Sequence, residues 1–388
     1  MREQVWQLFR SSGRRSDRRR TVPVAAAVAV GIMTMGTLAP PVASAAARSD
    51  TTQKGLNALV HTNGVPAALA SVGDRDGRTR TYLAGVGDLA TGAQVPRDGQ
   101  VRIGSNTKSF TAVVVLQLVG EGKVSLDAPV DTYLPGLVRG DGIDGRRITV
   151  RQLLQHTSGL PNYSKYLSES IRYYDPRELL GLGLALQHEA DFAPGTKWAY
   201  SNTNYVVAGL IVQNVTGRSL AEEIDRRVIK RIGLHHTYFP APGEVAIRER
   251  HPRGYYQDSV DAPLIDATEW DPSWAWAAGQ MVSTDSDLNR FFTALLAGRL
   301  LPKAQLDQMR TTVPASYPFP AGARYGLGLV STPLSCGGVY WGHGGSMTGY
   351  ETRGGATDEG RAANVAVTTQ PSQATKERMD EVDAALCR

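Results

Sequence analysis

The sequence predicts an α+β protein in which an antiparallel sheet, built from both ends of the chain and flanked by helices, carries an inserted all-helical lobe. Strand-like runs separated by turn residues occur near both ends of the chain, whereas the middle holds helical candidates joined by loops rich in Gly, Pro, Asp and Tyr. At 388 residues, of which 41% are hydrophobic, the chain is long enough for one large two-lobed domain.

The first part of this domain reads as a helix followed by a hairpin. The run "TTQKGLNALVHTNG" predicts a helix that stops at Gly64, and "PAALASV" and "RTRTYLAGVGDL" predict two strands joined by "GDRDG". A short strand, "QVRIG", comes next. From Ser109 the run "SFTAVVVLQLVGEGK" is apolar on nearly every side, which predicts a helix buried in the middle of the fold.

The remaining elements follow the same division into a helical middle and a strand-rich end. Helices are predicted at 149–157, 176–187, 204–217, 219–233, 283–298 and 373–387. Strands are predicted at 325–331, 337–345, 349–358 and 361–370, the last two joined by an Asp-Glu-Gly turn. We therefore expect a sheet lobe at about 48–104 and 275–388, and a helical lobe at about 105–274.

The N-terminus accounts for the whole net charge of +5, because seven arginines and two acidic residues lie within the first 20 residues. The rest of the chain has no basic stripe, which argues against nucleic acid as a partner. The Arg-rich start, the apolar run "VPVAAAVAVGIMTMGTLA" and the small residues around 43–47 predict a cleaved export signal at 1–47 and a secreted protein with no stable membrane span. A membrane anchor is the weaker alternative, and the choice between the general and the twin-arginine export route stays open.

The only two cysteines, Cys336 and Cys387, lie near the C-terminus. In an exported protein an even pair suggests a disulfide, here tying the last helix to the preceding sheet. Two buried free thiols are the alternative.

A serine and a lysine stand one helical turn apart in "RIGSNTKSF", at the start of the buried helix and so at the junction of the two lobes. Ser105 is the only serine with a lysine, Lys108, three residues further on. On one face of a helix, a lysine kept neutral by burial can take the proton of a serine hydroxyl that attacks a carbonyl carbon. A surface helix cap is the simpler interpretation of the pair taken alone.

Two further elements of the same chemistry each occur once and in the expected order. Tyr200 is the only tyrosine followed two residues later by Asn, here Asn202, and His343 is the only histidine followed two residues later by Gly, here Gly345. No "HExxH" or "GxSxG" motif occurs, and His235 and His236 lack metal-ligand spacing, so we expect neither a metal nor another cofactor.

With these three elements the chain resembles the serine penicillin-recognising enzymes, the family of class C β-lactamases and secreted D-alanyl-D-alanine carboxypeptidases. The resemblance covers nearly the whole chain after the signal and also rests on "LLQHTSGLPNY", "PGTKWAYSNTNYVVAGLIV", "YGLGL" and the placing of the two cysteines. It implies a β-lactamase/DD-peptidase-like fold and a monomer that acts through an acyl-enzyme on peptidoglycan peptides or other small acyl substrates and reacts with β-lactams.

The resemblance also implies a role for each residue of the three elements. Ser105 would be the acylated nucleophile and Lys108 its base, Tyr200 would pass a proton to the leaving nitrogen, and Asn202 would hydrogen-bond Lys108 and the substrate amide.

The remaining expected roles fall on the C-terminal strand and on one loop. His343 would stand on an edge strand and orient Tyr200, and Gly345 would let the substrate approach that strand. The backbone N–H groups of Ser346 and Ser105 would form the oxyanion hole. Trp274 would wall the cleft, although it could instead fill the core, and His156 is expected to shape a turn rather than to act in catalysis.

Two positions depart from the carboxypeptidases that the chain resembles most. Where those enzymes carry the Arg and the Thr that hold the substrate's terminal carboxylate, this chain has Val330 and Gly344, and Arg353 is a possible substitute. D-Ala-D-Ala carboxypeptidase is the expected activity. An esterase, a D-aminopeptidase, a class C-like β-lactamase and a non-catalytic peptidoglycan-binding or sensor protein stay open as alternatives.

Overall fold

The computed structural model describes residues 51–167, 172–184, 188–259, 262–370 and 375–387. The expected export signal at 1–47 lies outside the described residues, as do the end of the helix expected at 176–187 and the start of that expected at 373–387.

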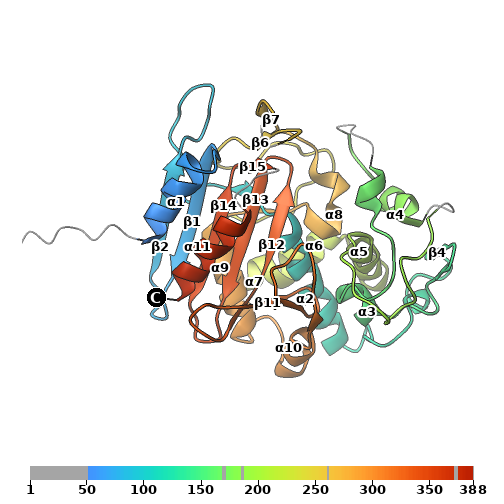
Figure 1. The fold of residues 1–388 in the computed structure, drawn as a ribbon. Helices are drawn as coiled ribbons and strands as arrows, with labels where there is room; N and C mark the ends of the chain where they lie inside the picture. The colour runs from blue at the N-terminus through green and yellow to red at the C-terminus, as the bar shows by residue number, and fades with distance from the viewer. Residues whose placement is uncertain (1–50, 168–171, 185–187, 260–261, 371–374, 388) are drawn as a thin grey trace, which may run out of the picture. The chain divides into compact units, whose positions relative to one another are not determined.

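An eight-stranded sheet is assembled from both ends of the chain (Figure 1). Its neighbours pair antiparallel throughout, as predicted. In spatial order its strands are β2 (Thr79–Gly85), β1 (Ala67–Gly73), β14 (Ala362–Val367), β13 (Tyr350–Ala356), β12 (Val339–Met347), β11 (Val330–Pro333), β10 (Arg324–Tyr325) and β9 (Val313–Pro314).

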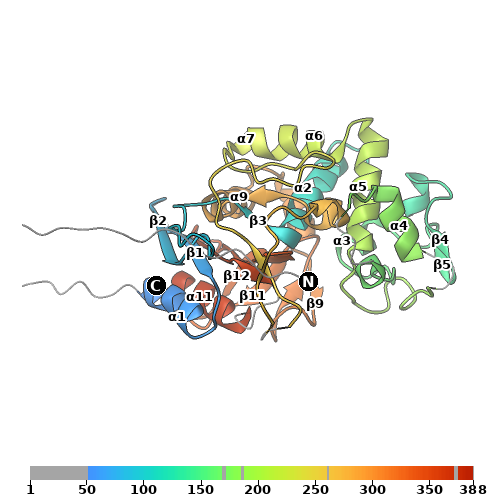
Figure 2. The same ribbon diagram turned by 90° about the horizontal axis from the view of Figure 1, so that it is seen from above.

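Helices cover both faces of this sheet, as Figure 2 shows from above. Helices α1 (Thr51–His61) and α11 (Thr375–Leu386) contribute to one apolar core with alternate residues of β1 and β14, and α9 (Asp285–Leu296) packs on the opposite face. Because both faces are covered, every residue of β14 is buried and its sequence is a nearly continuous apolar run.

The helical lobe lies between β3 (Val101–Arg102) and β8 (Val282–Ser283), two short strands that pair with each other. Its helices are α2 (Thr107–Gly120), α3 (Val150–Leu154), α4 (Pro176–Leu184), α5 (Thr203–Thr216), α6 (Leu220–Ile224), α7 (Lys230–Ile232) and α8 (Trp276–Gly279). A π turn at Asp225–Ile229 joins α6 to α7, where the sequence predicted one helix. The other short elements are α10 (Lys303–Met309), β4 (Arg139–Gly140), β5 (Ile143–Asp144), β6 (Tyr255–Tyr256), β7 (Ile265–Asp266) and β15 (Thr369–Gln370).

Helix α2 is buried from Thr107 to Leu118 and contacts both α5 and α8, as its all-round apolar sequence predicted. The first turn of α2, which carries Lys108, is thereby withdrawn from water.

The strand predicted at 325–331 is wrong: the chain turns between β10 and β11, which pair with each other. Gly328 makes this turn with φ +75°, and a side chain there would meet Ala112 and the Lys108 carbonyl at 2.5 and 3.1 Å. The close approach to α2 therefore breaks a run that reads as one strand.

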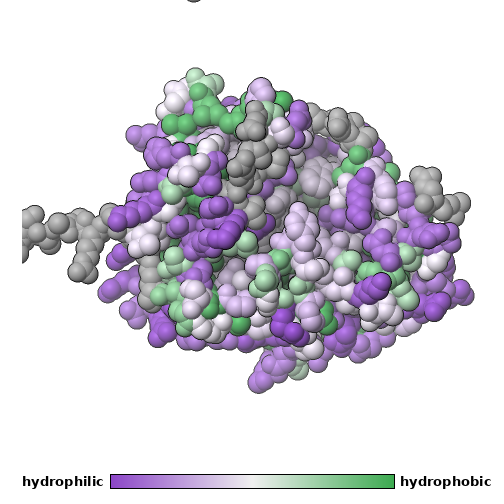
Figure 3. Space-filling view, viewed as in Figure 1, coloured by the Kyte–Doolittle hydropathy of each residue, from purple (hydrophilic) through white to green (hydrophobic). Residues whose placement is uncertain are grey.

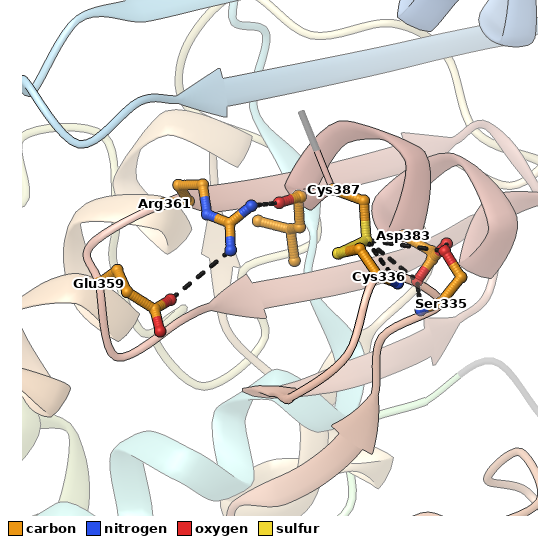
Figure 4. The surroundings of a disulfide bond; sticks show 7 residues. Ser335, Cys336, Glu359, Arg361, Asp383 and Cys387 are labelled. Atoms are coloured by element: carbon orange, nitrogen blue, oxygen red, sulfur yellow. Dashed lines mark hydrogen bonds and ion pairs between the residues drawn. A yellow bond between two sulfur atoms is a disulfide. The ribbon is translucent and has the colours of Figure 1, made fainter.

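The predicted disulfide is present between Cys336 and Cys387. It joins the turn between β11 and β12 to the end of α11, beside Ser335 and Asp383 (Figure 4). The last helix is thus tied to the sheet.

The protein surface seen in Figure 3 is mainly hydrophilic, with apolar residues in small separate patches. No helix within the described ranges is both long and apolar enough to cross a membrane.

Candidate active site

Ser105 and Lys108 meet at the start of α2, where the short 3-10 turn Gly104–Asn106 leads into the helix. Lys108 Nζ lies 3.0 Å from Ser105 Oγ, and it donates to Asn202 Oδ1 at 2.7 Å and to the Ala278 carbonyl at 2.8 Å. Ser105 is partly exposed, whereas Lys108 is completely buried. The pair therefore combines a reachable hydroxyl with an amine enclosed by neutral acceptors.

Burial lowers the pKa of Lys108 well below its ordinary value. Among the described residues no carboxylate forms an ion pair with this amine, and its three oxygen partners are a hydroxyl, an amide and a backbone carbonyl. The neutral amine that proton transfer from Ser105 requires is thus favoured by the surroundings.

Tyr200 lies beside this pair, in the segment that precedes α5. Lys108 Nζ lies 4.8 Å from the centroid of its ring. Burial raises the pKa of Tyr200 above its ordinary value, although the nearby Ser105 side chain and the charge of Arg353 oppose that rise. The phenol is therefore a neutral proton donor in the resting site.

Asn202 is fixed by one hydrogen bond of its backbone and one of its side chain. Its backbone N–H donates to Asn162 Oδ1 at 3.1 Å, and its side-chain oxygen accepts from Lys108. Two of the three elements predicted from spacing are thus brought together, because Lys108 contacts Ser105, Asn202 and the ring of Tyr200.

The backbone of β12 passes directly against the turn that carries Ser105. A Cβ added to Gly104 would lie 2.7 Å from the Ser346 nitrogen, and one added to Gly345 would lie 2.8 Å from the Ser105 nitrogen. Gly104 also has φ +49°, which a residue with a side chain rarely adopts. The two glycines thus let the N–H groups of Ser105 and Ser346 lie near each other, as an oxyanion hole requires.

His343 lies on β12, and two expectations about it need correction. The strand is not at the edge of the sheet, because β11 pairs with it from Val339 to Gly342; only from His343 onward does β13 alone pair with it. Nor does His343 orient Tyr200 through a hydrogen bond, because the partners of its ring are Tyr325 and the Gly344 carbonyl.

The imidazole of His343 instead lies 3.0 Å from the hydroxyl of Tyr325 through Nε2 and 2.6 Å from the Gly344 carbonyl through Nδ1. Because a carbonyl only accepts, Nδ1 carries the proton and Nε2 accepts from the tyrosine. Burial lowers the pKa of His343 to about 3, so the ring is neutral. The turn between β10 and β11 places Tyr325 beside His343. The contact could not be predicted as long as residues 325–331 were interpreted as one strand.

The positions expected to bind a terminal carboxylate lie beside Arg353, whose guanidinium is already engaged by backbone carbonyls. Gly344 pairs with Arg353, and the guanidinium donates to the carbonyls of Thr352 and Gly345 at 2.8 and 3.3 Å. Thr352 Oγ1 accepts from Asn106 beside Ser105, so the neighbouring Arg353 points to the opposite face of the sheet. Its guanidinium nevertheless lines one pocket with His343 and Gly344, and its charge is felt by Tyr200. Its Nη1 already donates to two backbone carbonyls, so it is not a free cation waiting for a carboxylate.

Val330 occupies the second of these positions and is buried. It belongs to a small apolar cluster against which the rings of Trp198, Tyr200 and Phe319 pack. An apolar wall thus stands where the carboxypeptidases have a cation.

Trp274 is half-buried in the turn before α8 and packs partly against the main core. Its carbonyl accepts from the hydroxyl of Tyr163 at 2.6 Å. Its role as a cleft wall stays a prediction.

Within the described ranges no cluster of His, Cys, Asp and Glu has the arrangement of a metal site. The residue that spacing could not reveal is Ala278, because it acts through its carbonyl, and no side-chain motif marks a backbone acceptor.

The comparisons with known proteins agree with this geometry. The family described as Beta-lactamase matches residues 53–387. A D-stereospecific amidohydrolase from Streptomyces sp. is 40% identical with a TM-score of 0.78, covering 85% of this chain and 97% of that one. D-amino acid amidase from Ochrobactrum anthropi SV3, complexed with L-phenylalanine amide, is 29% identical with a TM-score of 0.76, covering 86% and 96%.

Among curated proteins, penicillin-binding protein 4 of Amycolatopsis lactamdurans is 31% identical over 248 residues, which are 62% of this chain and 61% of that protein. Other curated relatives are matched over only 37% of their length. The family match spans nearly all of the described residues and includes every residue of the site, so the chain belongs to the beta-lactamase family of serine hydrolases.

Proposed function

We propose that this chain hydrolyses amides, esters or short peptides of D-amino acids through an acyl-enzyme on Ser105. The observation that carries the proposal is the buried Lys108 amine, 3.0 Å from the Ser105 hydroxyl and surrounded by neutral oxygens. Ser105 Oγ attacks the acyl carbon while Lys108 Nζ takes its proton. The N–H groups of Ser105 and Ser346 stabilise the oxyanion that forms.

The second half of acylation needs a proton on the leaving group. Tyr200, beside Ser105 and Lys108, gives its proton to the departing nitrogen and is reprotonated from Lys108. Water then attacks the Ser105 ester, and the acid leaves with Ser105 restored. His343 acts indirectly, because it holds Tyr325 rather than Tyr200.

The substrate class follows from the missing clamp. A free carboxylate next to Val330 and Gly344 would have to compete for Arg353 with the Thr352 and Gly345 carbonyls, which already accept hydrogen bonds from its guanidinium. A neutral amide or ester suits that surface better. The similarity to a D-stereospecific amidohydrolase and to a D-amino acid amidase supports the same choice.

D-Ala-D-Ala carboxypeptidase, the activity expected from the sequence motifs, is the second candidate. Its support is the similarity to penicillin-binding protein 4. It requires that Arg353 exchange its carbonyl partners for the substrate carboxylate, or that another group bind that carboxylate.

The experiment is a substrate panel with the wild type and Ser105→Ala. The panel contains D- and L-alanine p-nitroanilide, D-phenylalanine amide, a diacetyl-Lys-D-Ala-D-Ala peptide and a fluorescent penicillin. We expect hydrolysis of the D-amides, much less of the L-forms, and none by Ser105→Ala. Release of D-alanine from the peptide with no amide turnover supports the second candidate, and no Ser105-dependent turnover of any compound contradicts both.

We also propose that residues 1–47 are an export signal. The disulfide between Cys336 and Cys387 supports export, because disulfides persist mainly in oxidising compartments. N-terminal sequencing of the secreted protein should begin close to residue 48, whereas a cytoplasmic protein that retains the segment contradicts the proposal.

A further inference from the structure

His156 is a buried histidine that the proposed chemistry does not use, yet it holds the backbone on both sides of Tyr200. Its carbonyl accepts from the Ala199 N–H at 3.0 Å, and its Nδ1 accepts from the Ser201 N–H at 3.3 Å. Tyr200 is therefore flanked by two hydrogen bonds to one residue. The segment from Trp198 to Ser201 belongs to no helix or strand, so these bonds take the place of regular secondary structure.

The hydrogen bonds around the imidazole fix its tautomer. Asn204 Nδ2 lies 3.0 Å from Nδ1, and Asn204 Oδ1 accepts from Ser158 Oγ at 2.5 Å, which turns the amide nitrogen toward the ring. Since a backbone N–H only donates, Nδ1 must be the acceptor, and the proton lies on Nε2. Burial lowers the pKa of His156 well below its ordinary value, which keeps the ring neutral.

The ring also packs on the aromatic group that surrounds the site. Its centroid lies 4.4 Å from that of Tyr200 and 4.9 Å from that of Tyr325, the partner of His343. The backbone of His156 is left-handed, with φ +61°, a conformation that a non-glycine residue adopts at a cost. The His156 ring thus contacts the Tyr200 ring from a backbone conformation that is unfavourable for a residue with a side chain.

We propose that His156 is the positioning residue for Tyr200: it fixes the backbone and ring of Tyr200 so that the phenol keeps its position beside Ser105. The inference rests on the proposed function, in which Tyr200 moves protons. A displacement of about 1 Å in such a group can lower a rate roughly 10²-fold. Loss of the imidazole should therefore lower kcat and leave KM nearly unchanged.

Three variants test the proposal with D-alanine p-nitroanilide as substrate. His156→Gly keeps the left-handed backbone and removes ring and acceptor, so kcat should fall roughly 10–10²-fold. His156→Asn tolerates the same φ and keeps an acceptor near the Nδ1 position, so it should restore most of that loss. Asn204→Asp puts an acceptor opposite Nδ1, which forces a proton onto it and deprives Ser201 of its acceptor; kcat should fall without a change in KM.

Two controls separate positioning from a loss of stability. Leu210→Ala, in the core of α5, should lower Tm at least as much as His156→Gly does and leave kcat within a few-fold of wild type. In a Tyr200→Phe background, His156→Gly should cause little further loss, because both changes remove the same contribution.

A crystal structure of His156→Gly gives a readout independent of turnover. We expect the Tyr200 hydroxyl to have moved away from Ser105 Oγ. An unmoved phenol, a wild-type kcat in His156→Gly, or a full additional loss in the Tyr200→Phe background overturns the proposal. If the wild type itself fails to turn over the substrate panel, the proposed function is wrong, and the position of the phenol still decides what His156 does.

Discussion

Substitution of Gly345 by alanine should slow acylation strongly, although the change adds only one methyl group. The new Cβ would lie 1.9 Å from the Ile103 carbonyl oxygen and 2.8 Å from the Ser105 nitrogen. The ordinary distance between heavy atoms in contact is about 3.5 Å. Both obstacles are backbone atoms, which no rotamer change can move, so β12 and the turn at Ser105 must separate by more than about 1 Å.

That separation would carry the Ser346 N–H away from the Ser105 N–H. Loss of one oxyanion donor typically lowers the rate about 10²–10³-fold, and we expect kcat of Gly345→Ala to fall into this range. The assay is steady-state hydrolysis of D-alanine p-nitroanilide, with Tm measured in parallel to exclude unfolding.

Gly344→Ala is the matched control, one residue away on the opposite face of β12. The three atoms nearest to its Cβ would all belong to the Arg353 side chain, at 2.5 to 2.9 Å, and this flexible side chain, unlike a backbone, can move aside. We expect kcat within a few-fold of wild type. A Gly345→Ala enzyme with the wild-type rate, or equal losses in both variants, refutes the reasoning.

Three further outcomes are expected. Lys108→Met should lower kcat about 10²–10⁴-fold, whereas the exposed Lys165→Met should not; similar rates in both variants would show that Lys108 is not the base. The wild-type acylation rate should rise with pH as Lys108 loses its proton and level off well below the ordinary lysine pKa, because burial lowers the pKa of Lys108; a rise that continues to the ordinary value would contradict a neutral amine. Replacing Cys336 and Cys387 by serine opens a loop of 51 residues. The free energy of unfolding should then fall by about 4 kcal/mol on the chain-entropy model with kcat preserved; an unchanged unfolding curve in denaturant would argue against that contribution.

The sequence predicted the fold class and the group of Ser105, Lys108, Tyr200 and Asn202, because these predictions rest on local patterns. Ser105 and Lys108 share a helical turn, so their contact follows from helix geometry once the helix is recognised. The burial of Lys108 could also be expected, since α2 is apolar on all sides.

What the sequence did not predict depends on contacts between distant segments. The partner of His343 is Tyr325, which reaches it only because Gly328 turns the chain between β10 and β11. The Ala278 carbonyl, which accepts from Lys108, is a backbone group and leaves no side-chain signal. The direction of Arg353 depends on the register of β12 and β13, and a shift of one residue would reverse it.

The most direct test is mass spectrometry of the protein after brief reaction with a fluorescent penicillin or a D-amino acid ester. Trypsin should release the peptide Ile103–Lys108, which contains Ser105 as its only serine. We predict one acyl adduct on this peptide, absent in Ser105→Ala. In Lys108→Met trypsin no longer cleaves after position 108, and we predict much less adduct on the longer peptide from Ile103 to Lys123. An adduct on another residue, or none with any acyl donor of the panel, would contradict nucleophilic attack by Ser105 with Lys108 as its base.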